Sequence, residues 1–500
     1  MRKYIFSQKA VLSLVTLAIL VTGCEKRGDT GLFVPAPCPI EVPDGVLESG
    51  KFSFGYMKVP ELHAYPDGKT IELAVAIHKC QGESATLEPL VLITGGPGMS
   101  DIDTFVPELF GDLGTLFLDN RDVVVIELRG LKYAKPNLIL PEIDNLQLYL
   151  SDKSLSVEES LALYMDSLQG AYDRLEREGV NLSAYNDYEI ANDIAYVMEQ
   201  LHYDTFSVFG SSFGTLVAQH LLLNHSEKLA SVTMNALVDI NRALPGMHTN
   251  SIRALENIFN ACENDPELSK AYPNLKNRFL ATLARLNERP DTLEITYGKT
   301  GALYRVPLNG NKLSVWLFGN MYWDAQIPAT LDRILSGDYS QIIEQPGMIF
   351  PLEDFSYGLS LSIILAEYSN FEADDIPLNN EYADYVKGCG LMPFSPYFLN
   401  RAREVWKVND IQNKNIRLVS DVPALVFSGA LDHVCPPNYA RDLSASLEHS
   451  YVYVFPGIAH SPIDAGACGI MMMKEFVDHP AKAPDSSCLQ DFSEGFNLPD

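Results

Sequence analysis

The chain has 500 residues, is 47% hydrophobic and carries a formal net charge of −28. Length alone predicts roughly two to four domains, although α/β folds often form longer single domains. The acidic balance leaves no excess of Lys or Arg to neutralise phosphates, so nucleic acid is not expected as a partner. It is compatible with a cationic substrate group, although an ordinary acidic surface is the better explanation.

The N-terminus has the features of an export signal. "MRKY" is basic, and "AVLSLVTLAILV" is apolar but too short to cross a bilayer comfortably. The small residues of "VTGC" resemble a bacterial lipoprotein processing site, which implies that Cys24 is lipidated after residues 1–24 are processed. We therefore expect a lipid anchor in the bacterial cell envelope, facing the periplasm or the exterior, with residues 25–37 as a tether. An uncleaved anchor is the alternative, and no other stretch of the sequence is apolar enough to span a membrane.

Residues 38–240 predict the first part of an α/β sheet. "FSFGYMKVPEL" and "TIELAVAIHKC" flank the turn signal "YPDGK" and predict an antiparallel pair. "EPLVLITGGPG", "RDVVVIELRG", "DTFSVFG" and "LASVTMNALV" are short apolar runs, typical of strands buried on both faces of a parallel sheet. "YEIANDIAYVMEQL" and "TLVAQHLLLNH" predict helices between strands. This alternation indicates right-handed crossovers.

The alternation stops at residues 241–415, where apolar spacings of three and four predict a mainly helical insertion, or cap. It resumes over residues 416–500, in "VPALVFSGALD", "HSYVYVFPGIAH" and a closing helix around "GIMMMKEFVDH". The expected fold class is therefore α/β: a mostly parallel sheet with helices on both faces, interrupted by a large helical cap.

The turn "GSSFG" at residues 210–214 is the strongest candidate for a catalytic site. It fits G-x-S-x-G in one register, which places Ser212 between Gly210 and Gly214. A buried strand precedes it and a helix follows, which is the context of a nucleophile elbow. The helix N-terminus favours developing negative charge. Ser211 takes the variable position, and its side chain should point elsewhere. A tight structural turn is the alternative.

A serine hydroxyl needs a base to take its proton and an acid to orient that base. Asp432 follows one predicted strand and His460 follows the next, so both lie where loops of an open α/β sheet carry function. His433 is the rival base, but we prefer His460 because it approaches from a separate loop. His202, His220 and His225 are expected to be structural.

An oxyanion hole is the remaining requirement. In "LITGGPGMS", Gly95 and Gly96 let the backbone approach a substrate oxygen closely, and Pro97 has no N–H to donate. We expect one N–H from Gly96 and the other from Phe213. A phosphate-binding loop is a poor alternative, since no Lys follows in the P-loop pattern. The cysteines form no C-x-x-C pair, so we expect no metal, and nothing indicates a cofactor.

These pieces together resemble the proline iminopeptidase / tripeptidyl aminopeptidase family of α/β-hydrolases. The matching segments, in order along most of the mature chain, are "GGPG", "ELRG", "GSSFGT", "GALDHVCPP" and "GIAH". The chain departs from the family pattern at Glu127, where Asp is usual, at Phe213, where Tyr is usual, and at Thr94, where His is common. These departures leave the expected catalytic groups intact and put proline specificity in doubt.

The resemblance implies a serine hydrolase of exo-aminopeptidase type, which releases residues or short peptides through an acyl-enzyme. It also implies a cap carboxylate that binds the substrate's α-ammonium, for which Glu367 is the candidate; an ordinary helix-surface glutamate is the alternative. The cap should act as a lid that favours short peptides. The alternatives are a carboxylesterase for small esters and a non-catalytic surface lipoprotein that binds ligands.

The resemblance further implies a disulfide between Cys468 and Cys488. A Cys38–Cys80 pair and a Cys262–Cys389 pair are additional expectations, and Cys435 is the candidate for an unpaired thiol. An exported protein meets an oxidising compartment, where such bonds persist. The seven cysteines other than Cys24 cannot all pair within one chain.

Overall fold

The computed structural model describes residues 33–241, 246–321, 326–367, 381–411 and 416–498. The expected export signal and Cys24 lie outside the described residues. None of the helices in the described ranges is both long enough and apolar enough to cross a membrane.

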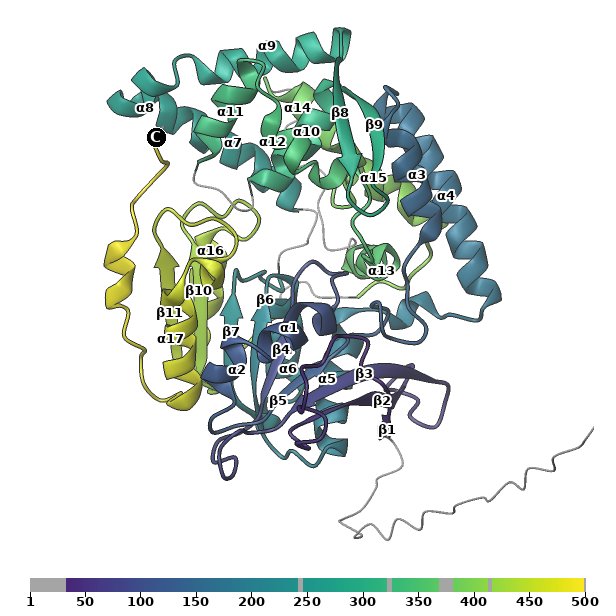
Figure 1. Ribbon diagram of the computed structural model, residues 1–500, viewed down its shortest axis with the longest axis vertical. Coiled ribbons are helices and arrows are strands. Elements are labelled where there is room, and N and C mark those ends of the chain that lie inside the picture. The colour runs from purple at the N-terminus through teal and green to yellow at the C-terminus, as the bar shows by residue number, and fades with distance from the viewer. Residues whose placement is uncertain (1–32, 242–245, 322–325, 368–380, 412–415, 499–500) are drawn as a thin grey trace, which may run out of the picture. The chain divides into compact units, whose positions relative to one another are not determined.

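A nine-stranded sheet organises the described chain, with the strand order β1-β2-β3-β5-β4-β6-β7-β10-β11 (Figure 1). Its strands are β1 (Phe33–Pro35), β2 (Phe52–Pro60), β3 (Thr70–His78), β4 (Leu90–Ile93), β5 (Val123–Ile126), β6 (Phe206–Ser211), β7 (Leu229–Asn235), β10 (Ala424–Gly429) and β11 (Ser450–Phe455). The pairings from β1 to β5 are antiparallel, and the pairings from β5 to β11 are parallel. The predicted antiparallel pair at the N-terminal edge is confirmed as β2 and β3.

The inner parallel strands β4, β5, β6, β7 and β10 are almost entirely buried, as their continuous apolar runs predict, whereas the edge strand β11 is half-buried. All four residues of β5 are buried, and successive side chains of a strand point to opposite faces. Val124 and Ile126 therefore join one hydrophobic core, whereas Val123 and Val125 join another on the opposite face.

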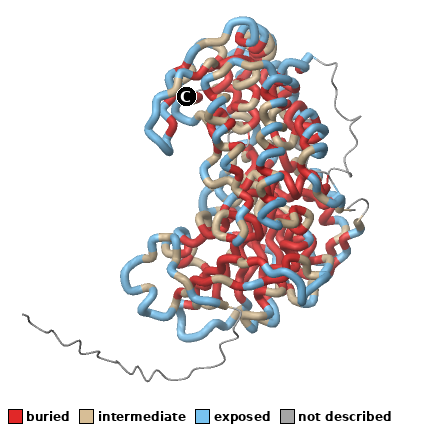
Figure 2. Tube along the Cα trace, turned by 90° about the vertical axis from the view of Figure 1, so that its right-hand side faces the viewer, coloured by how far each residue is buried: buried red, intermediate tan, exposed pale blue. Residues whose placement is uncertain are grey.

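Helices cover both faces of the sheet, which confirms the expected fold class. Those that pack in the first core are α4 (Val157–Arg177), α5 (Asp187–Gln200), α6 (Phe213–Asn224) and α16 (Pro437–Ser444), and those in the second core are α1 (Asp101–Leu109), α2 (Asp112–Phe117) and α17 (Ala467–Asp478). Every residue of α6 from Phe213 to Leu222 is buried, so this helix is enclosed on all sides. Buried residues gather in the interior of the described chain, and exposed residues lie at its periphery (Figure 2).

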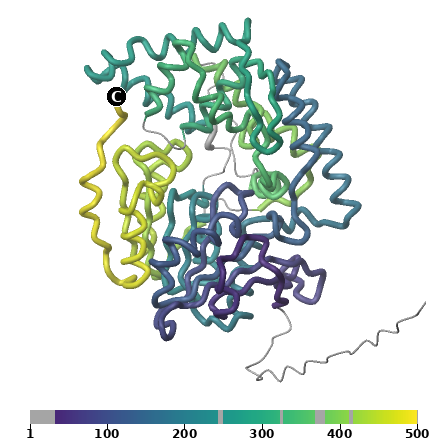
Figure 3. The backbone as a smooth tube through the Cα atoms, viewed as in Figure 1, coloured from purple at the N-terminus to yellow at the C-terminus, as the bar shows by residue number. Residues whose placement is uncertain are grey.

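Between β7 and β10 the chain leaves the sheet and forms a mainly helical segment with a core of its own (Figure 3). Its helices are α7 (Gly246–Asn264), α8 (Pro266–Ala271), α9 (Leu275–Glu288), α10 (Gly310–Asn320), α11 (Ile327–Leu335), α12 (Ser340–Glu344), α13 (Tyr357–Glu367), α14 (Ala383–Gly388) and α15 (Pro396–Val405). Two of these helices, α13 and α15, place their apolar residues in the first core of the sheet. Outside the segment, α3 (Pro141–Ser151) packs on α4, and α4 in turn packs on α15.

The segment also contains a two-stranded antiparallel sheet that the helical spacing did not predict. It consists of β8 (Asp291–Tyr297) and β9 (Ala302–Leu308). In β8 the side chains of Leu293, Ile295 and Tyr297 are buried and alternate with exposed neighbours. This period of two is the ordinary signal of a half-buried strand.

The cysteines pair less than expected. Cys468 and Cys488 form a disulfide, as the family resemblance implies. The expected Cys38–Cys80 and Cys262–Cys389 pairs are wrong, because all four of these residues are free. Their surroundings explain this: the Cys80 thiol donates to the carbonyl of Asp119 at 3.2 Å, and Cys262 and Cys389 pack as apolar side chains in the core of the helical segment.

Candidate active site

The turn between β6 and α6 holds Ser212 in a strained backbone conformation, with φ of 50° and ψ of −116°. Such positive φ values are uncommon for residues other than glycine, and they cluster at functional sites. Neither flanking glycine can be replaced by a residue with a side chain, because backbone atoms of neighbouring segments lie too close. A Cβ on Gly210 would lie 2.4 Å from the carbonyl oxygen of Gly214, and one on Gly214 would lie 2.7 Å from that of Ile93.

The two adjacent serines of this turn have different partners. The Ser212 hydroxyl is hydrogen-bonded to Nε2 of His460 at 2.9 Å. The Ser211 hydroxyl instead accepts a hydrogen bond from the side-chain amide of Asn235, at the end of β7, at 2.9 Å. The structure therefore singles out Ser212 as the serine beside a base.

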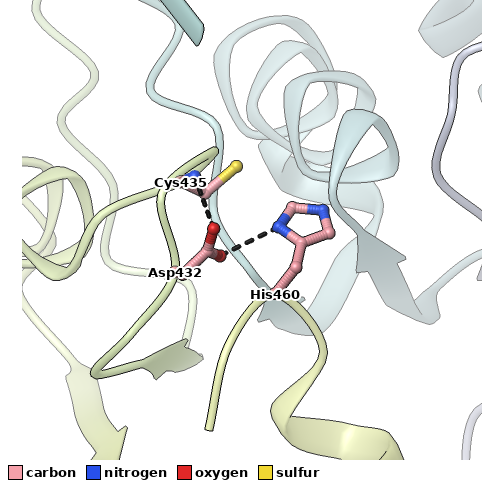
Figure 4. A group of neighbouring side chains, drawn as sticks. All are labelled: Asp432, Cys435 and His460. Atoms are coloured by element: carbon pink, nitrogen blue, oxygen red, sulfur yellow. Dashed lines mark hydrogen bonds and ion pairs between the residues drawn. The ribbon is translucent and has the colours of Figure 1, made fainter. Parts of the chain in front are cut away.

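Asp432 completes a hydrogen-bonded chain of three side chains. Its Oδ2 lies 2.9 Å from Nδ1 of His460 (Figure 4). Nε2 of the same ring is the atom bonded to Ser212. Asp432 and His460 are both buried, and each follows a strand, β10 and β11 respectively. The structure thus brings together the three residues that the sequence order suggested.

The other oxygen of Asp432 is fixed by the backbone of its own loop. Oδ1 accepts the N–H groups of Val434 and Cys435, each at 2.8 Å. Burial alone would raise the pKa of the Asp432 carboxyl, but the His460 ring and the Cys435 N–H outweigh burial and lower it. The lowered pKa favours the ionised carboxylate, and its orientation toward His460 is set by two backbone N–H groups that do not depend on the substrate.

The loop that carries His460 lies directly against the end of β10. A Cβ on Gly429 would lie 1.7 Å from the carbonyl oxygen of Ala459, so only glycine fits at this position. This contact sets the distance between the acid and the base, which come from neighbouring strands.

His433, the rival base, has a different environment. It is fully buried, its ring packs edge-on against Phe318 of α10 at a centroid distance of 5.6 Å, and burial lowers its pKa to about 4. Two of the histidines expected to be structural also have partners of their own: His220 contacts Asp187, and His225 contacts Asn192.

The two residues expected to supply the oxyanion hole, Gly96 and Phe213, lie on segments next to Ser212. The GGPG loop (residues 94–100) follows β4, and a Cβ on its Gly95 would lie 2.9 Å from the Ser212 Cβ, so the loop rests against the nucleophile. Gly96 has a φ of 108°, a conformation that favours glycine. Phe213 is the first residue of α6, and the first N–H groups of a helix have no partner within the helix. The ring of Phe213 is buried in the first core of the sheet.

The helical segment contacts the GGPG loop, which the sequence did not indicate. The N–H of Ser356 donates to the carbonyl of Gly98 at 2.9 Å, and a Cβ on Gly98 would meet the ring of Phe355 at 2.6 Å. The segment therefore lies at the carboxyl end of the parallel strands, beside the candidate active site (Figure 1).

Asp432, Cys435 and His460 together have donor atoms within 4.8 Å of one another, a spacing that a metal ion could use. Their chemistry fits a metal poorly. The carboxylate and the imidazole are hydrogen-bonded to each other, and burial and the Asp432 charge raise the pKa of the Cys435 thiol well above its usual value. A protonated thiol is not the ligand that metals prefer.

Glu367, the expected ammonium-binding residue, has other partners. It ends α13, is 3% exposed, and interacts with Asp187, which is paired with His220 at 2.9 Å. Burial, followed by the Asp187 charge, raises the pKa of Glu367 well above its usual range, which disfavours the charged form. A buried acid whose charged form is disfavoured is less suited to bind a cation than an exposed carboxylate. A pocket of about 380 Å³ adjoins His460 instead, lined in part by Ser461, Asp464 and Phe492.

The geometry can activate a serine. An imidazole that is oriented by a carboxylate can accept the Ser212 proton as the oxygen attacks a carbonyl carbon, and nearby N–H groups can stabilise the oxyanion that results.

Comparisons with known proteins agree with this architecture. A family model described as "alpha/beta hydrolase fold" matches residues 88–467, more than half of the chain. No curated protein matches the sequence. Similar solved structures include a thermophilic esterase from Thermogutta terrifontis, with 13% identity and a TM-score of 0.37, covering 85% of this chain and 99% of that chain. They also include a proline iminopeptidase from Mycobacterium smegmatis, with 12% identity and a TM-score of 0.37, covering 85% and 98% respectively.

Proposed function

Because the chain belongs to the alpha/beta hydrolase fold family, we propose that it is a serine hydrolase that works through an acyl-enzyme on Ser212. The observation that carries this proposal is the continuous hydrogen-bonded chain from Ser212 through His460 to Asp432. The strained elbow supports it, because such strain is stored where function uses it.

The proposed reaction has two halves. In the first, Nε2 of His460 takes the Ser212 proton while Oγ attacks an amide or ester carbonyl, and the N–H groups of Gly96 and Phe213 donate to the oxyanion. His460 then gives its proton to the leaving amine or alcohol. In the second half, His460 activates a water molecule that releases the acyl group and restores Ser212. Asp432 holds the imidazole in the tautomer that both halves need.

The finer proposal is an exo-aminopeptidase that acts on short peptides. It rests on the order of the five motif segments from residues 95 to 460 and on the acidic charge of the chain. Contact between the helical segment and the GGPG loop supports a lid role, because a covered site admits small substrates more readily than folded proteins. Since Glu367 is a buried acid, the group that would bind the substrate ammonium is a different one.

Labelling with a fluorophosphonate, followed by a substrate panel, tests this function. We expect the probe to modify the wild type on Ser212 and not on Ser211, as mapped by mass spectrometry of the peptide that contains both. Aminoacyl and peptidyl amides with a free α-amino group should turn over faster than their N-blocked counterparts. Preferred turnover of acyl esters would assign the chain to the carboxylesterases. A folded protein that the probe does not label would contradict the hydrolase proposal and favour a binding lipoprotein.

We also propose that the protein is exported and lipid-anchored through Cys24. The Cys468–Cys488 disulfide supports export, because such bonds persist in oxidising compartments. Metabolic labelling with an alkyne fatty acid in a bacterial host should mark the wild type in the membrane fraction, and Cys24→Ser should remove the label. A Cys38→Ser variant serves as the matched control and should stay labelled. Equal labelling of wild type and Cys24→Ser would disprove the assignment.

A further inference from the structure

Two buried acids hold the ends of the GGPG loop. At its start, the N–H of Thr94 donates to Oδ1 of Asp101 at 2.7 Å. At its end, the hydroxyl of Ser100 donates to Oε2 of Glu127 at 2.9 Å. Both acids are completely buried. Gly96, the expected oxyanion donor, lies between these two fixed points.

Glu127 is the more extensively bonded of the two acids. Its Oε2 also accepts the N–H of Ile102 at 3.0 Å, and its Oε1 accepts the N–H of Tyr133 at 3.1 Å. Glu127 directly follows β5, which pairs with β4, the strand that leads into the GGPG loop. One carboxylate thus joins the end of a buried strand to the loop and to the first turn of α1.

Contacts on a second side leave the loop little room to relax. Phe355 and Ser356 of the helical segment rest on Gly98, and Ser356 also donates its hydroxyl to the carbonyl of Gly130 at 2.7 Å. Gly95 is in contact with Ser212. We therefore expect a change at the Glu127 anchor to alter the distance between the Gly96 N–H and the nucleophile.

We propose that Glu127 is a positioning residue for the Gly96 oxyanion donor and acts through the GGPG loop. This inference rests on the proposed serine hydrolase function. An oxyanion donor works only when it lies about 2.7–3.1 Å from the position of the developing charge. Misplacement by about 1 Å, even from a distance, can cost roughly 100-fold in rate. The effect should appear in kcat, because the oxyanion exists only in the transition state and the intermediate.

Because the role depends on the charge state of Glu127, kcat should change with pH in a way that the test can detect. Burial raises its pKa to about 7, although three donated hydrogen bonds oppose the rise and the Asp103 charge adds to it. The other titratable groups around it are Asp101, Lys132 and Tyr133. Ionised Glu127 accepts all three hydrogen bonds. Its protonated form has a hydroxyl in place of one acceptor, and the amide of Gln likewise has one acceptor fewer.

The test compares Glu127→Gln with Asp122→Asn at several pH values. Asp122 is the matched control: it is buried, lies at the opposite end of β5, and accepts the N–H of Cys80 at 2.8 Å. At pH 8.5 we expect Glu127→Gln to lower kcat roughly 10- to 100-fold and to leave KM within about 3-fold of the wild-type value. Losses of this size are typical when a residue that positions a catalytic group is changed. Asp122→Asn should lower the melting temperature and leave kcat within about 3-fold.

Lowering the pH gives the second readout. As Glu127 becomes protonated below about pH 7, the wild-type kcat should fall toward that of Glu127→Gln, so the ratio of the two approaches one. Ser100→Ala removes the hydroxyl contact with Glu127 and also the acceptor of the Asp103 N–H at the start of α1. It should lower kcat by roughly 3- to 10-fold, and it keeps the test valid if Glu127→Gln does not fold.

Three results would overturn the inference: a pH-independent ratio, an unchanged kcat in both Glu127→Gln and Ser100→Ala, or an equal loss of kcat in Asp122→Asn. A wild type that neither reacts with a fluorophosphonate nor turns over any substrate would overturn the proposed function as well. An active wild type beside an equally active Glu127→Gln overturns the positioning role alone.

Discussion

Replacement of Ser212 with Ala should lower kcat by at least about 10³-fold, since removal of a nucleophile leaves only binding and oxyanion stabilisation. The reason is chemical, because the hydroxyl is the only group of this side chain that contacts His460. Alanine keeps the Cβ and the backbone strain, so the variant should fold like the wild type. Initial rates on the best substrate of the panel and a thermal melt measure the two quantities.

Ser211→Ala is the matched control for this experiment. It removes a hydroxyl one residue away that is bonded to Asn235 and not to His460. It should retain kcat within about 3-fold and lose only the modest stability of one hydrogen bond, on the order of 1 kcal/mol. If Ser211→Ala were as inactive as Ser212→Ala, or if Ser212→Ala kept a tenth of the wild-type rate, the assignment of the nucleophile would be wrong.

Asp432→Asn should cost on the order of 10⁴-fold in kcat, because it traps His460 in the wrong tautomer. The orientation of the introduced amide follows from the two N–H groups of Val434 and Cys435, which require an acceptor at the Oδ1 position. The amide oxygen of Asn must therefore take that position, which turns its NH₂ group toward Nδ1 of His460. Nδ1 then becomes the acceptor, and Nε2 carries the proton and cannot accept another from Ser212.

Stability distinguishes this explanation from a general collapse of the loop. Asp432→Asn keeps an acceptor for both N–H groups, whereas Asp432→Ala leaves them buried without one, at a cost of about 1–3 kcal/mol. We therefore expect Asp432→Ala to melt well below Asp432→Asn, while both are nearly inactive. An Asp432→Asn variant with a tenth or more of the wild-type rate would show that the tautomer is not fixed in this way.

The sequence predicted which residues the fold brings together where each signal is local. Ser212, Asp432 and His460 each follow a strand that is recognisable from its own apolar run, and the sheet then brings the three strand ends to one edge. The elbow is local too, since Gly210 and Gly214 are required by contacts within a five-residue turn and with β4.

The predictions failed where long-range packing decides. Glu127 and Ser100 are far apart in the sequence, and nothing around Glu127 indicates that it accepts three hydrogen bonds. Glu367 was expected to be a cap carboxylate that binds an ammonium group, and the sequence did not indicate that it is buried beside Asp187, which raises its pKa. Cys262 and Cys389 are free thiols within one hydrophobic core, and their sequence spacing alone cannot tell such a pair from a disulfide. The β8–β9 hairpin is the exception, since its alternating pattern was visible within a helical region.

The position of the helical segment in the chain has a consequence for how activity arises during synthesis. The segment separates β7 from β10, so the nucleophile precedes it while the acid and the base follow it. A nascent chain that ends within the segment carries an elbow with neither partner. The proton relay is completed only when β10 pairs with β7 in the nearly finished protein, with Ala424 opposite Val232. Closing so long a loop costs little more entropy than closing a shorter one, because the cost grows only with the logarithm of loop length. The order of the elements along the chain thus keeps the hydrolase inactive until its last strands have been made.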